Sequence, residues 1–548
     1  MASESSAVNG DAARDDGAPN IEALFLIRFD KKVGYTIAWK RSTADIALDN
    51  AVEFKSLPSG LHSVASDLVY FTHEGYAGLS AFAQGNAGAE ERNANFVSVG
   101  ILVKNEGWAG RLGRAWLLAG RLEKMAAVLA EDSELVAPLE EFWQEHQATP
   151  KTAGDASEAT DRRGHSRARA VSTLSAVAPN DESLPPYHPA LAILTYINLF
   201  GPLVFRLQQA ALLRKRILFV GSAPVRLACE FVYNLSVLSS ISPRDADRLA
   251  PGTDHLLRLP SLFSIGVHDI PTLENLRDSK HGGHTPGTEA PEGWAACTTD
   301  EIIATKPKLY DIVVNLPPTS DVSSQARRWP RIRTSDGSSV KASQRDVARY
   351  KLLHRGLFRH QNKSQTLPEP YTDEQDSDAA PLLSRDEVDN KRADDDFNEA
   401  YDDTGVEPMT WSQLAYQGFM WWASAGEANA YTTAERDTDR ELIGDLQGYA
   451  DSVETAVIAY FHRQTSHLIQ TLAQLLNGSD RKDDDDDGER DGGDTLVMDR
   501  DDLSRMGLDT WSEGDRAFVQ EFASVYFGRA VEIKGSEVEC CGLRVPVL

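Results

Sequence analysis

The sequence predicts an α/β fold, and a short strand–turn–helix unit is the main reason. Residues 217–220 form an uncharged apolar run, which Gly221 and Ser222 end. From Val225 apolar side chains recur at helical spacing, just after Pro224, a residue type that favours the first turn of a helix. A strand without polar alternation is usually covered by helices on both faces, so the unit indicates an α/β layer architecture.

The part of the chain before this unit is rich in strand-like segments and ends in a helical stretch. The strand-like segments are residues 21–30, 33–40, 51–57, 67–73, 76–82 and 96–103. Residues 108–147 then show helical spacing of apolar side chains. Strands first and a long helix last are typical of a small α+β domain.

The rest of the chain supplies more strands and several helices. Residues 191–215 read as one apolar helix that leads into the strand–turn–helix unit. Strand-like segments follow at residues 256–267, 294–303 and 309–316, with 298–301 expected to face solvent. Helical spacing appears at residues 345–359, 409–427, 452–476 and 516–531.

Changes in composition divide the chain into structured parts and polar or acidic insertions. In the first part of the chain we expect a disordered tail (residues 1–20), a strand-rich lobe (21–148), a linker (149–183) and an α/β lobe (184–318). After these we expect a mostly disordered insertion (319–405), a helical part (406–477), an acidic loop (478–502) and a C-terminal helix with its tail (503–548).

The charge of the chain is concentrated in two segments. Its 548 residues carry a formal net charge of −27, and Asp and Glu dominate residues 373–403 and 480–502. A chain this acidic is a poor candidate for nucleic-acid binding. Its 4 cysteines are too few for a disulfide framework, and residues 1–20 lack the apolar core of a signal peptide. Residues 184–205 contain several prolines and read as a buried helix rather than a membrane span, so we expect a cytoplasmic protein.

Several segments suggest a catalytic or ligand-binding site, but each lacks residues or spacing that such a site requires. The turn after residue 220 lacks both the second glycine and the Lys-Ser/Thr pair of a P-loop. His281 and His284 would need further ligands to bind a metal, and residues 483–487 lack the spacing of a calcium loop. We find no metalloprotease, hydrolase or kinase signature. The sequence therefore predicts no catalytic residue, cofactor or metal, and indicates a protein that works by binding.

Three groups of segments resemble the DENN-domain proteins. The segments LFLIRFDKKVGYTIAWK, LPSGLHSVASDLVYF and NFVSVGILV resemble the longin-like upstream lobe of a DENN domain. The segments HPALAILTYINLFGPLVFRLQQAALLRKRILFVGSAP, LFSIGVHDI and YDIVVNL resemble its central module. The segments TWSQLAYQGFMWWASAGE and DRAFVQEFASVYFGRAVEI resemble the end of the LCHN-like subgroup in its fungal form.

The resemblance implies a longin-like α+β lobe, a DENN α/β lobe and a helical downstream part, with disordered acidic insertions. It also implies a guanine-nucleotide exchange factor for a Rab-type GTPase in membrane trafficking. Such a protein does no bond chemistry, because it accelerates exchange by binding the nucleotide-free GTPase better than the loaded one. The alternative is a non-catalytic adaptor or Rab effector on a trafficking or lipid-storage organelle. Peripheral association with intracellular membranes and the oligomeric state stay open.

The implied GTPase-binding groove lies between residues 21–147 and 184–316. Ser222 and Arg226 follow the carboxyl end of a predicted strand, where α/β sheets present ligand-facing groups, and are the candidate GTPase contacts. Helix capping and ordinary surface charge are the competing explanations for these two residues. Downstream, Trp411, Trp421 and Trp422 are candidates for core packing or for an interface.

Overall fold

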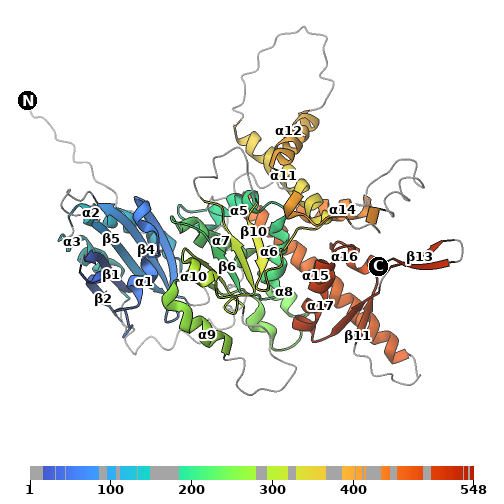
Figure 1. Cartoon of the computed structure of the whole chain (residues 1–548), viewed down its shortest axis with the longest axis horizontal. Helices are drawn as coiled ribbons and strands as arrows, with labels where there is room; N and C mark the ends of the chain where they lie inside the picture. Colours follow the sequence, from blue (N-terminus) through green and yellow to red (C-terminus); the bar gives the residue numbers. More distant parts are fainter. Residues whose placement is uncertain are drawn as a thin grey trace, which may run out of the picture.

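A computed structural model of the chain places most of its segments in one continuous assembly (Figure 1). The described residues are 17–30, 32–43, 45–85, 95–105, 112–132, 134–148, 184–278, 293–318, 329–365, 385–400, 403–409, 413–414, 433–444, 453–485, 495–534, 536–540 and 543–547.

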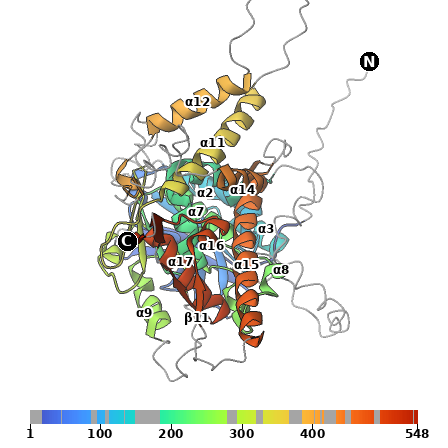
Figure 2. The ribbon, with the colours of Figure 1, turned by 90° about the vertical axis from the view of Figure 1, so that its right-hand side faces the viewer.

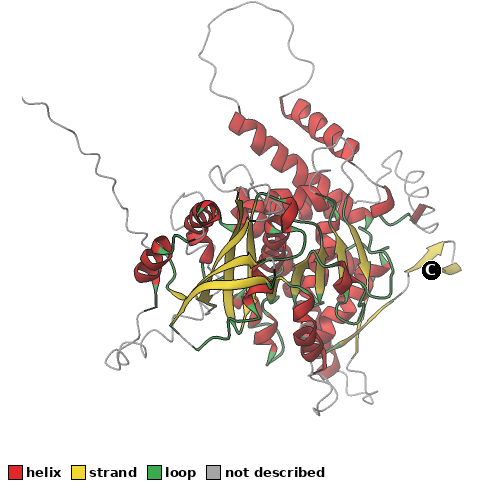
Figure 3. Cartoon of the chain, turned by 60° about the vertical axis from the view of Figure 1, so that its left-hand side comes forward, coloured by secondary structure: helices red, strands yellow, loops and turns green. Residues whose placement is uncertain are grey.

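A ten-stranded mixed sheet runs through both halves of the α/β region, with helices around it (Figure 3). Its strand order is β10-β9-β6-β8-β7-β3-β4-β5-β1-β2. The strands are β1 (Ile21–Asp30), β2 (Gly34–Ser42), β3 (Ser66–His73), β4 (Tyr76–Gly85), β5 (Asn95–Lys104), β6 (Ile217–Val220), β7 (Ser261–Ser264), β8 (Ala295–Thr298), β9 (Ile312–Asn315) and β10 (Arg331–Thr334). The structure therefore confirms the α/β class.

The strand-rich half forms an antiparallel meander, as its hairpin-like sequence predicts. β1 pairs with β2 and β5, β4 pairs with β3 and β5, and the Asp30 carboxylate accepts hydrogen bonds from Lys32 N and Val33 N in the first turn. Helices α2 (Ala119–Glu131) and α3 (Ala137–His146) pack on this half of the sheet. The helical stretch expected over 108–147 is thus two helices, preceded by the 3-10 turn η3 (Ala115–Leu118).

One strand expected in this half is a helix instead. Residues 51–57 contain helix α1 (Val52–Ser56), because the Glu53 carboxylate accepts hydrogen bonds from Asn50 N at 3.1 Å and Ala51 N at 3.0 Å. A carboxylate at this position satisfies backbone donors that have no partner within the helix. The fully buried Val52 then packs into the apolar cluster under the sheet.

The second half has parallel strands β7, β8, β6 and β9, with β10 antiparallel at the edge. Helix α7 (Arg226–Leu238) follows β6, which confirms the strand–turn–helix prediction. Two further expectations need correction. The segment 256–267 is strand only at β7, after the 3-10 turn η6 (Thr253–Leu256). Thr298 is buried at the end of β8, and residues 301–304 form helix α10 (Glu301–Ala304).

The apolar helix expected over residues 191–215 is broken at Gly201. Helix α5 (Ile193–Phe200) ends there, and α6 (Leu203–Leu212) begins after Pro202, preceded by the 3-10 turn η5 (Pro189–Ala192). Gly201 has φ +54°, and a Cβ on it would lie 2.7 Å from Nε1 of Trp329, so only glycine fits. Among the described helices no single one has the length and apolar character of a membrane span. The segment Pro189–Phe200 passes that test only together with α6, across a bend of 119°.

The downstream part is mainly helical and packs beside α6 and α7 (Figure 2). It contains α11 (Gln344–Gln365), α12 (Arg385–Ala400), η10 (Asp403–Gly405), α14 (Thr433–Ile443), α15 (Val453–Asp485), α16 (Arg500–Arg505), α17 (Glu513–Phe527), β11 (Thr495–Met498), β12 (Ala530–Ile533), β13 (Ser536–Cys540) and β14 (Leu543–Val547). Shorter elements of the α/β region are η1 (Leu61–Ser63), α8 (Pro243–Ala246), η7 (Val267–Asp269) and α9 (Ile270–Asp278).

Two expected insertions contain regular structure. The mostly disordered insertion predicted at 319–405 includes β10, α11 and α12 among its described residues. The acidic loop predicted at 478–502 begins within α15 and includes β11, which pairs in parallel with β12. Both expectations rested on local polar composition, whereas β10 and β11 are stabilised by strands elsewhere in the chain. Trp411, Trp421, Trp422, His281, His284 and the last residues of the 483–487 acidic run lie outside the described residues.

The buried Arg214 connects several elements of the core. Its side chain, 1% exposed, donates hydrogen bonds to Ala211 O at 2.6 Å, Leu256 O at 2.7 Å and Ser239 O at 3.3 Å. These carbonyls lie at the ends of α6, η6 and α7, where backbone oxygens lack helical partners and carry partial negative charge. The hydroxyl of Tyr526 from α17 donates to Leu212 O at 2.7 Å in the same place. One guanidinium therefore donates hydrogen bonds to backbone carbonyls at the ends of three helical segments.

Replacing Arg214 with methionine should destabilise the fold strongly, because it leaves buried carbonyls without a donor. We expect a loss of about 3 kcal/mol in the free energy of unfolding, measured by urea denaturation followed by circular dichroism. Arg214→Lys should also destabilise, since one ammonium group does not reproduce the planar fork of donors. Arg331→Met, at an exposed position of β10, is the matched control and should unfold like the unmodified chain. Equal midpoints for Arg214→Met and the control would contradict this role.

Candidate functional site

The carboxyl ends of the parallel strands meet the strand-rich half at one edge of the sheet. β6, β7, β8 and β9 all run in the same direction, so the turns that follow them share this edge. Open α/β sheets commonly bind ligands outside the carboxyl ends of their strands. Among the described residues, β3 and β7 pair in the sheet at one position, Phe71 with Phe263. Side chains must therefore provide much of the junction between the halves.

Asp67 is the main polar link across this junction. It begins the apolar part of β3, and its carboxylate accepts hydrogen bonds from Val225 N at 2.6 Å and Arg226 N at 3.2 Å, at the start of α7. Leu68 N, in the strand itself, donates to the same carboxylate at 2.9 Å. Burial raises the pKa of Asp67 to about 6, although these three N–H groups and Arg226 favour the charged form. A carboxylate from one half thus caps the positive end of a helix from the other.

A second set of contacts joins α1 to the turns after β7 and β8. The Lys55 ammonium lies 2.9 Å from the Asp269 carboxylate, and the ring of Phe54 stacks on that of His268 with centroids 3.8 Å apart. The Ser59 hydroxyl donates to Oδ1 of Asp300.

Asp300 uses both of its carboxylate oxygens at this edge. While Oδ1 accepts from the strand-rich half, Oδ2 accepts from Val267 N at 3.2 Å in the turn after β7. The α1 segment therefore holds two turns of the parallel half in fixed positions.

The two predicted contact residues lie where Asp67 holds the chain, Ser222 in the turn after β6 and Arg226 at the first position of α7. Ser222 is exposed at the tip of this turn. The Arg226 side chain is 38% exposed, and its Nε donates to Oε1 of Glu230 at 2.9 Å. Its guanidinium also lies 5.2 Å from the ring centroid of Tyr187. Both side chains reach the surface at the junction, and their contact with a GTPase stays a prediction.

Asp67 and Asp300 organise this edge, yet no sequence pattern assigned either a role, and Asp300 was expected only to face solvent, whereas it is partly buried and hydrogen-bonded. Each is an ordinary-looking acid beside an apolar segment, with no motif around it. The partners of Asp67 come from residues 225 and 226, far along the chain. A polar residue where a strand turns apolar was the one local signal, and it is too common to identify a junction.

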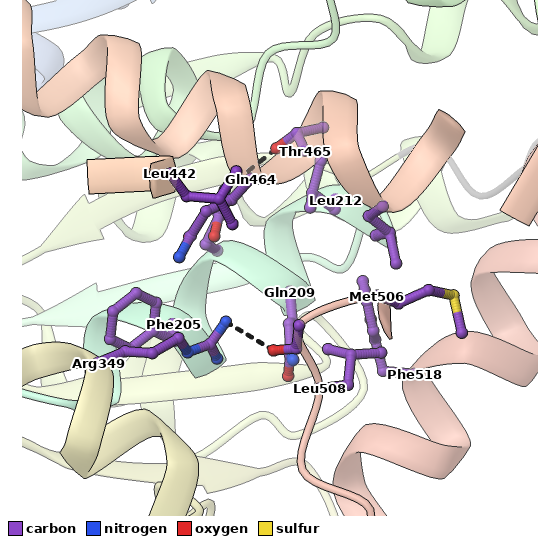
Figure 4. A pocket seen from close by; sticks show the side chains of 13 residues that line it. Phe205, Gln209, Leu212, Arg349, Leu442, Gln464, Thr465, Met506, Leu508 and Phe518 are labelled. Atoms are coloured by element: carbon purple, nitrogen blue, oxygen red, sulfur yellow. Dashed lines mark hydrogen bonds between the residues drawn. The ribbon is translucent and has the colours of Figure 1, made fainter. Parts of the chain in front are cut away.

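A cavity of about 30 Å³ lies elsewhere, between α6, α11, α15 and the loop before α17 (Figure 4). Arg349 lies against the ring of Phe205 and donates to Gly507 O at 3.0 Å, while Gln208 donates to the Thr465 hydroxyl at 3.2 Å. This volume suits one or two waters and is far too small for a nucleotide. Within the described ranges, no three acidic, His or Cys side chains are grouped so that they could hold a metal ion.

Comparison with known proteins places this junction inside one family match. Residues 24–326 match the family model of DENN domain-containing protein 11, and residues 406–546 match a domain of unknown function, DUF4484. Uncharacterized protein ANR2 of Saccharomyces cerevisiae is 23% identical over 550 residues, which cover 96% of this chain and 94% of that protein.

Vertebrate relatives match the first part of the chain. DENN domain-containing protein 11 of Xenopus laevis is 31% identical over 306 residues, 54% of this chain and 60% of that protein. The protein of the same name from Danio rerio is 30% identical over 298 residues, 54% of this chain and 53% of that protein. The matched region thus spans less than two thirds of either vertebrate relative.

The junction should make stability depend on pH through Asp67. Its folded-state pKa of about 6 lies above the ordinary value of 3.8, so the folded chain holds this proton more tightly than the unfolded chain. The protonated Asp67 carboxyl therefore adds to the free energy of unfolding below pH 4, and this contribution is lost as the pH rises to 6. Between pH 4 and 7 the unmodified chain should lose about 2 kcal/mol of unfolding free energy relative to Asp67→Asn.

The measurement is urea denaturation of both proteins across this pH range. Asp254→Asn, which changes an exposed carboxylate, is the matched control and should follow the unmodified chain. Parallel pH profiles for the unmodified chain and Asp67→Asn would contradict the assignment.

Proposed function

This chain belongs to the DENN domain-containing protein 11 family, and we propose that it is a guanine-nucleotide exchange factor for a Rab-type GTPase in membrane trafficking. Members of the DENN-domain family generally act as exchange factors for Rab GTPases. The observation that carries the proposal is the extent of the match, which includes most of β1, all of β2 to β9 and the junction residues described above.

The junction suits a protein that works by binding. Ser222 and Arg226 present a hydroxyl and a guanidinium at the surface, on a turn held by the buried Asp67. Preorganised groups of this kind lower the cost of ordering an interface. An exchange factor needs such a rigid surface, because it must bind the nucleotide-free GTPase more tightly than the nucleotide-bound form.

The proposal assigns roles to the parts of the chain. The meander β1–β5 with α2 and α3 serves as a longin-like lobe, the parallel half as the central DENN lobe, and the GTPase binds the edge that they share. Similarity to the yeast protein over nearly the whole chain supports placing it with the fungal form of the LCHN-like subgroup. The protein acts in the cytoplasm and associates peripherally with intracellular membranes where its Rab partner resides.

Nucleotide release tests the proposal directly. The full chain is added to purified Rab GTPases loaded with a fluorescent guanine nucleotide, and release is followed with and without it. We expect concentration-dependent acceleration for at least one Rab, and tighter binding to its nucleotide-free form. No acceleration across the panel, with binding that favours a GTP-loaded Rab, would instead show an effector or adaptor.

A pair of serine substitutions tests the position of the site. Ser222→Arg places a bulky charge on the exposed turn and should reduce the accelerated release rate by about tenfold or more, since it blocks a closely packed interface. Ser335→Arg makes the same change at an exposed position after β10, at the opposite edge of the sheet, and should leave the rate unchanged. Equal rates for the two variants would place the GTPase elsewhere.

A further inference from the structure

Helices α11 and α12 form a hairpin that projects from the body of the protein (Figures 1 and 2). Both helices lie between the two family-matched stretches, after residue 326 and before residue 406. The first turns of α11 are anchored in the core, where Asp346 forms ion pairs with Arg206 at 2.8 Å and with Arg349. The outer part of α11, residues 350–359, is contacted by α12.

The two helices have opposite charge. Asp346 is the one acidic residue of α11, whose basic residues are Arg345, Arg349, Lys351, Arg355, Arg359 and Lys363. In α12 acidic residues predominate: Asp386, Glu387, Asp389, Asp394, Asp395, Asp396 and Glu399. The hairpin therefore places an acidic helix on a basic one.

Side chains of α12 make specific contacts with α11: the Asn390 side-chain oxygen accepts a hydrogen bond from Arg359, and three further contacts lie in the second half of α12. Asp394 accepts two hydrogen bonds from the Arg355 guanidinium, from Nε and Nη2, each at 2.7 Å. Asp396 lies 3.1 Å from Nε2 of His354. Phe397 is only 2% exposed, and the Lys351 ammonium lies 4.8 Å from its ring centroid. Two carboxylates and one aromatic ring thus form an Asp-x-Asp-Phe pattern on this surface.

The bidentate ion pair between α12 and α11 is partly exposed to solvent, whereas the apolar contact is limited to the buried Ala393 and Phe397 side chains of α12. The side chains of Arg355 and Asp394 are 34% and 37% exposed, so solvent weakens their attraction. Consecutive acids at residues 394–396 lie in the second half of α12, where the helix dipole disfavours negative charge. Aspartate is also a poor helix former. Helix α12 therefore depends on its docking to α11, whereas α11 is anchored in the core without it.

We propose that residues 350–359 of α11 form a docking surface for an acidic helix of a partner protein that carries the Asp-x-Asp-Phe pattern. Helix α12 occupies this surface in the free chain and is displaced when the partner binds. We infer the chemistry of the partner from helix α12, because α12 is the segment that this surface already binds. The Arg355 fork matches a carboxylate, and the Phe397 position matches an aromatic ring beside Tyr350 and Lys351.

A labelled peptide with the sequence of residues 385–400 serves as the probe, and fluorescence anisotropy measures its binding to the full chain. The doubly substituted chain Asp394→Asn/Phe397→Ser should bind the peptide about tenfold or more tightly than the unmodified chain, because its own α12 no longer occupies the surface. The same two substitutions in the peptide should abolish its binding. Binding by the doubly substituted chain that is no tighter than that of the unmodified chain would overturn the proposal.

A charge exchange supplies a second test that requires no loss of apolar packing. Arg355→Glu should release α12 by repulsion from Asp394 and bind the peptide carrying Asp394→Arg, but not the native peptide. Arg333→Glu, at an exposed position of β10, is the matched control and should behave as the unmodified chain toward both peptides. Native-peptide binding that survives Arg355→Glu would overturn the proposal. The proposal would also be overturned if light scattering showed that the unmodified chain is a dimer and that the native peptide dissociates it. A second copy of the chain, rather than a partner protein, would then be the occupant of the surface.

Discussion

The guanidinium of Arg214 is the interaction on which the rest of the architecture depends. A cation without a carboxylate partner is costly to bury, yet here the carbonyl ends of α6, α7 and η6 converge on it and replace its hydration. Because Arg214 lies three residues before the first residue of β6, this arrangement fixes the direction in which the central strand enters the sheet. Gly293 packs so closely that a Cβ there would lie 1.9 Å from Arg214 O, so the strand leading into β8 is placed by the same residue.

A second buried group of charges fixes the downstream part against this core. Arg206 of α6 lies 2.8 Å from the Asp346 carboxylate of α11 and 2.7 Å from that of Asp515 in α17. Burying such charges gains little net stability, but a mismatched arrangement would leave a charge unpaired at considerable cost. The network therefore specifies one way of docking the DUF4484 match onto the DENN match, with α11 held between them. That anchoring also keeps the outer half of α11 in place as a surface.

The junction between the two halves of the sheet differs in kind from these cores. One residue pair of the sheet crosses it, and the side chains of Asp67, Lys55 and Asp300 supply polar contacts around that pair. Asp67 accepts hydrogen bonds from the backbone N–H groups of Val225 and Arg226, so it positions the surface formed by residues 221–226. Lys55 and Asp300 instead hold the turn after β7, through Asp269 and Val267 N. The apolar core also crosses this boundary, since Tyr70 of β3 and Phe263 of β7 belong to one buried cluster and their ring centroids lie 6.1 Å apart. A surface supported in this way loses little freedom when a partner binds.

The sequence by itself determined the elements whose signals are local. The apolar run at 217–220 with its following helix, the meander hairpins and the long helix α15 form as their periodicity predicts. Only the tertiary structure decided the features that need a distant partner. Residues 331–334 become a strand because β9 lies beside them, the helix breaks at Gly201 because Trp329 fills the space, and Asp67 gains its role from N–H groups at residues 225 and 226. Local spacing encodes which face of an element is apolar, but it does not encode which residue far along the chain will meet that face.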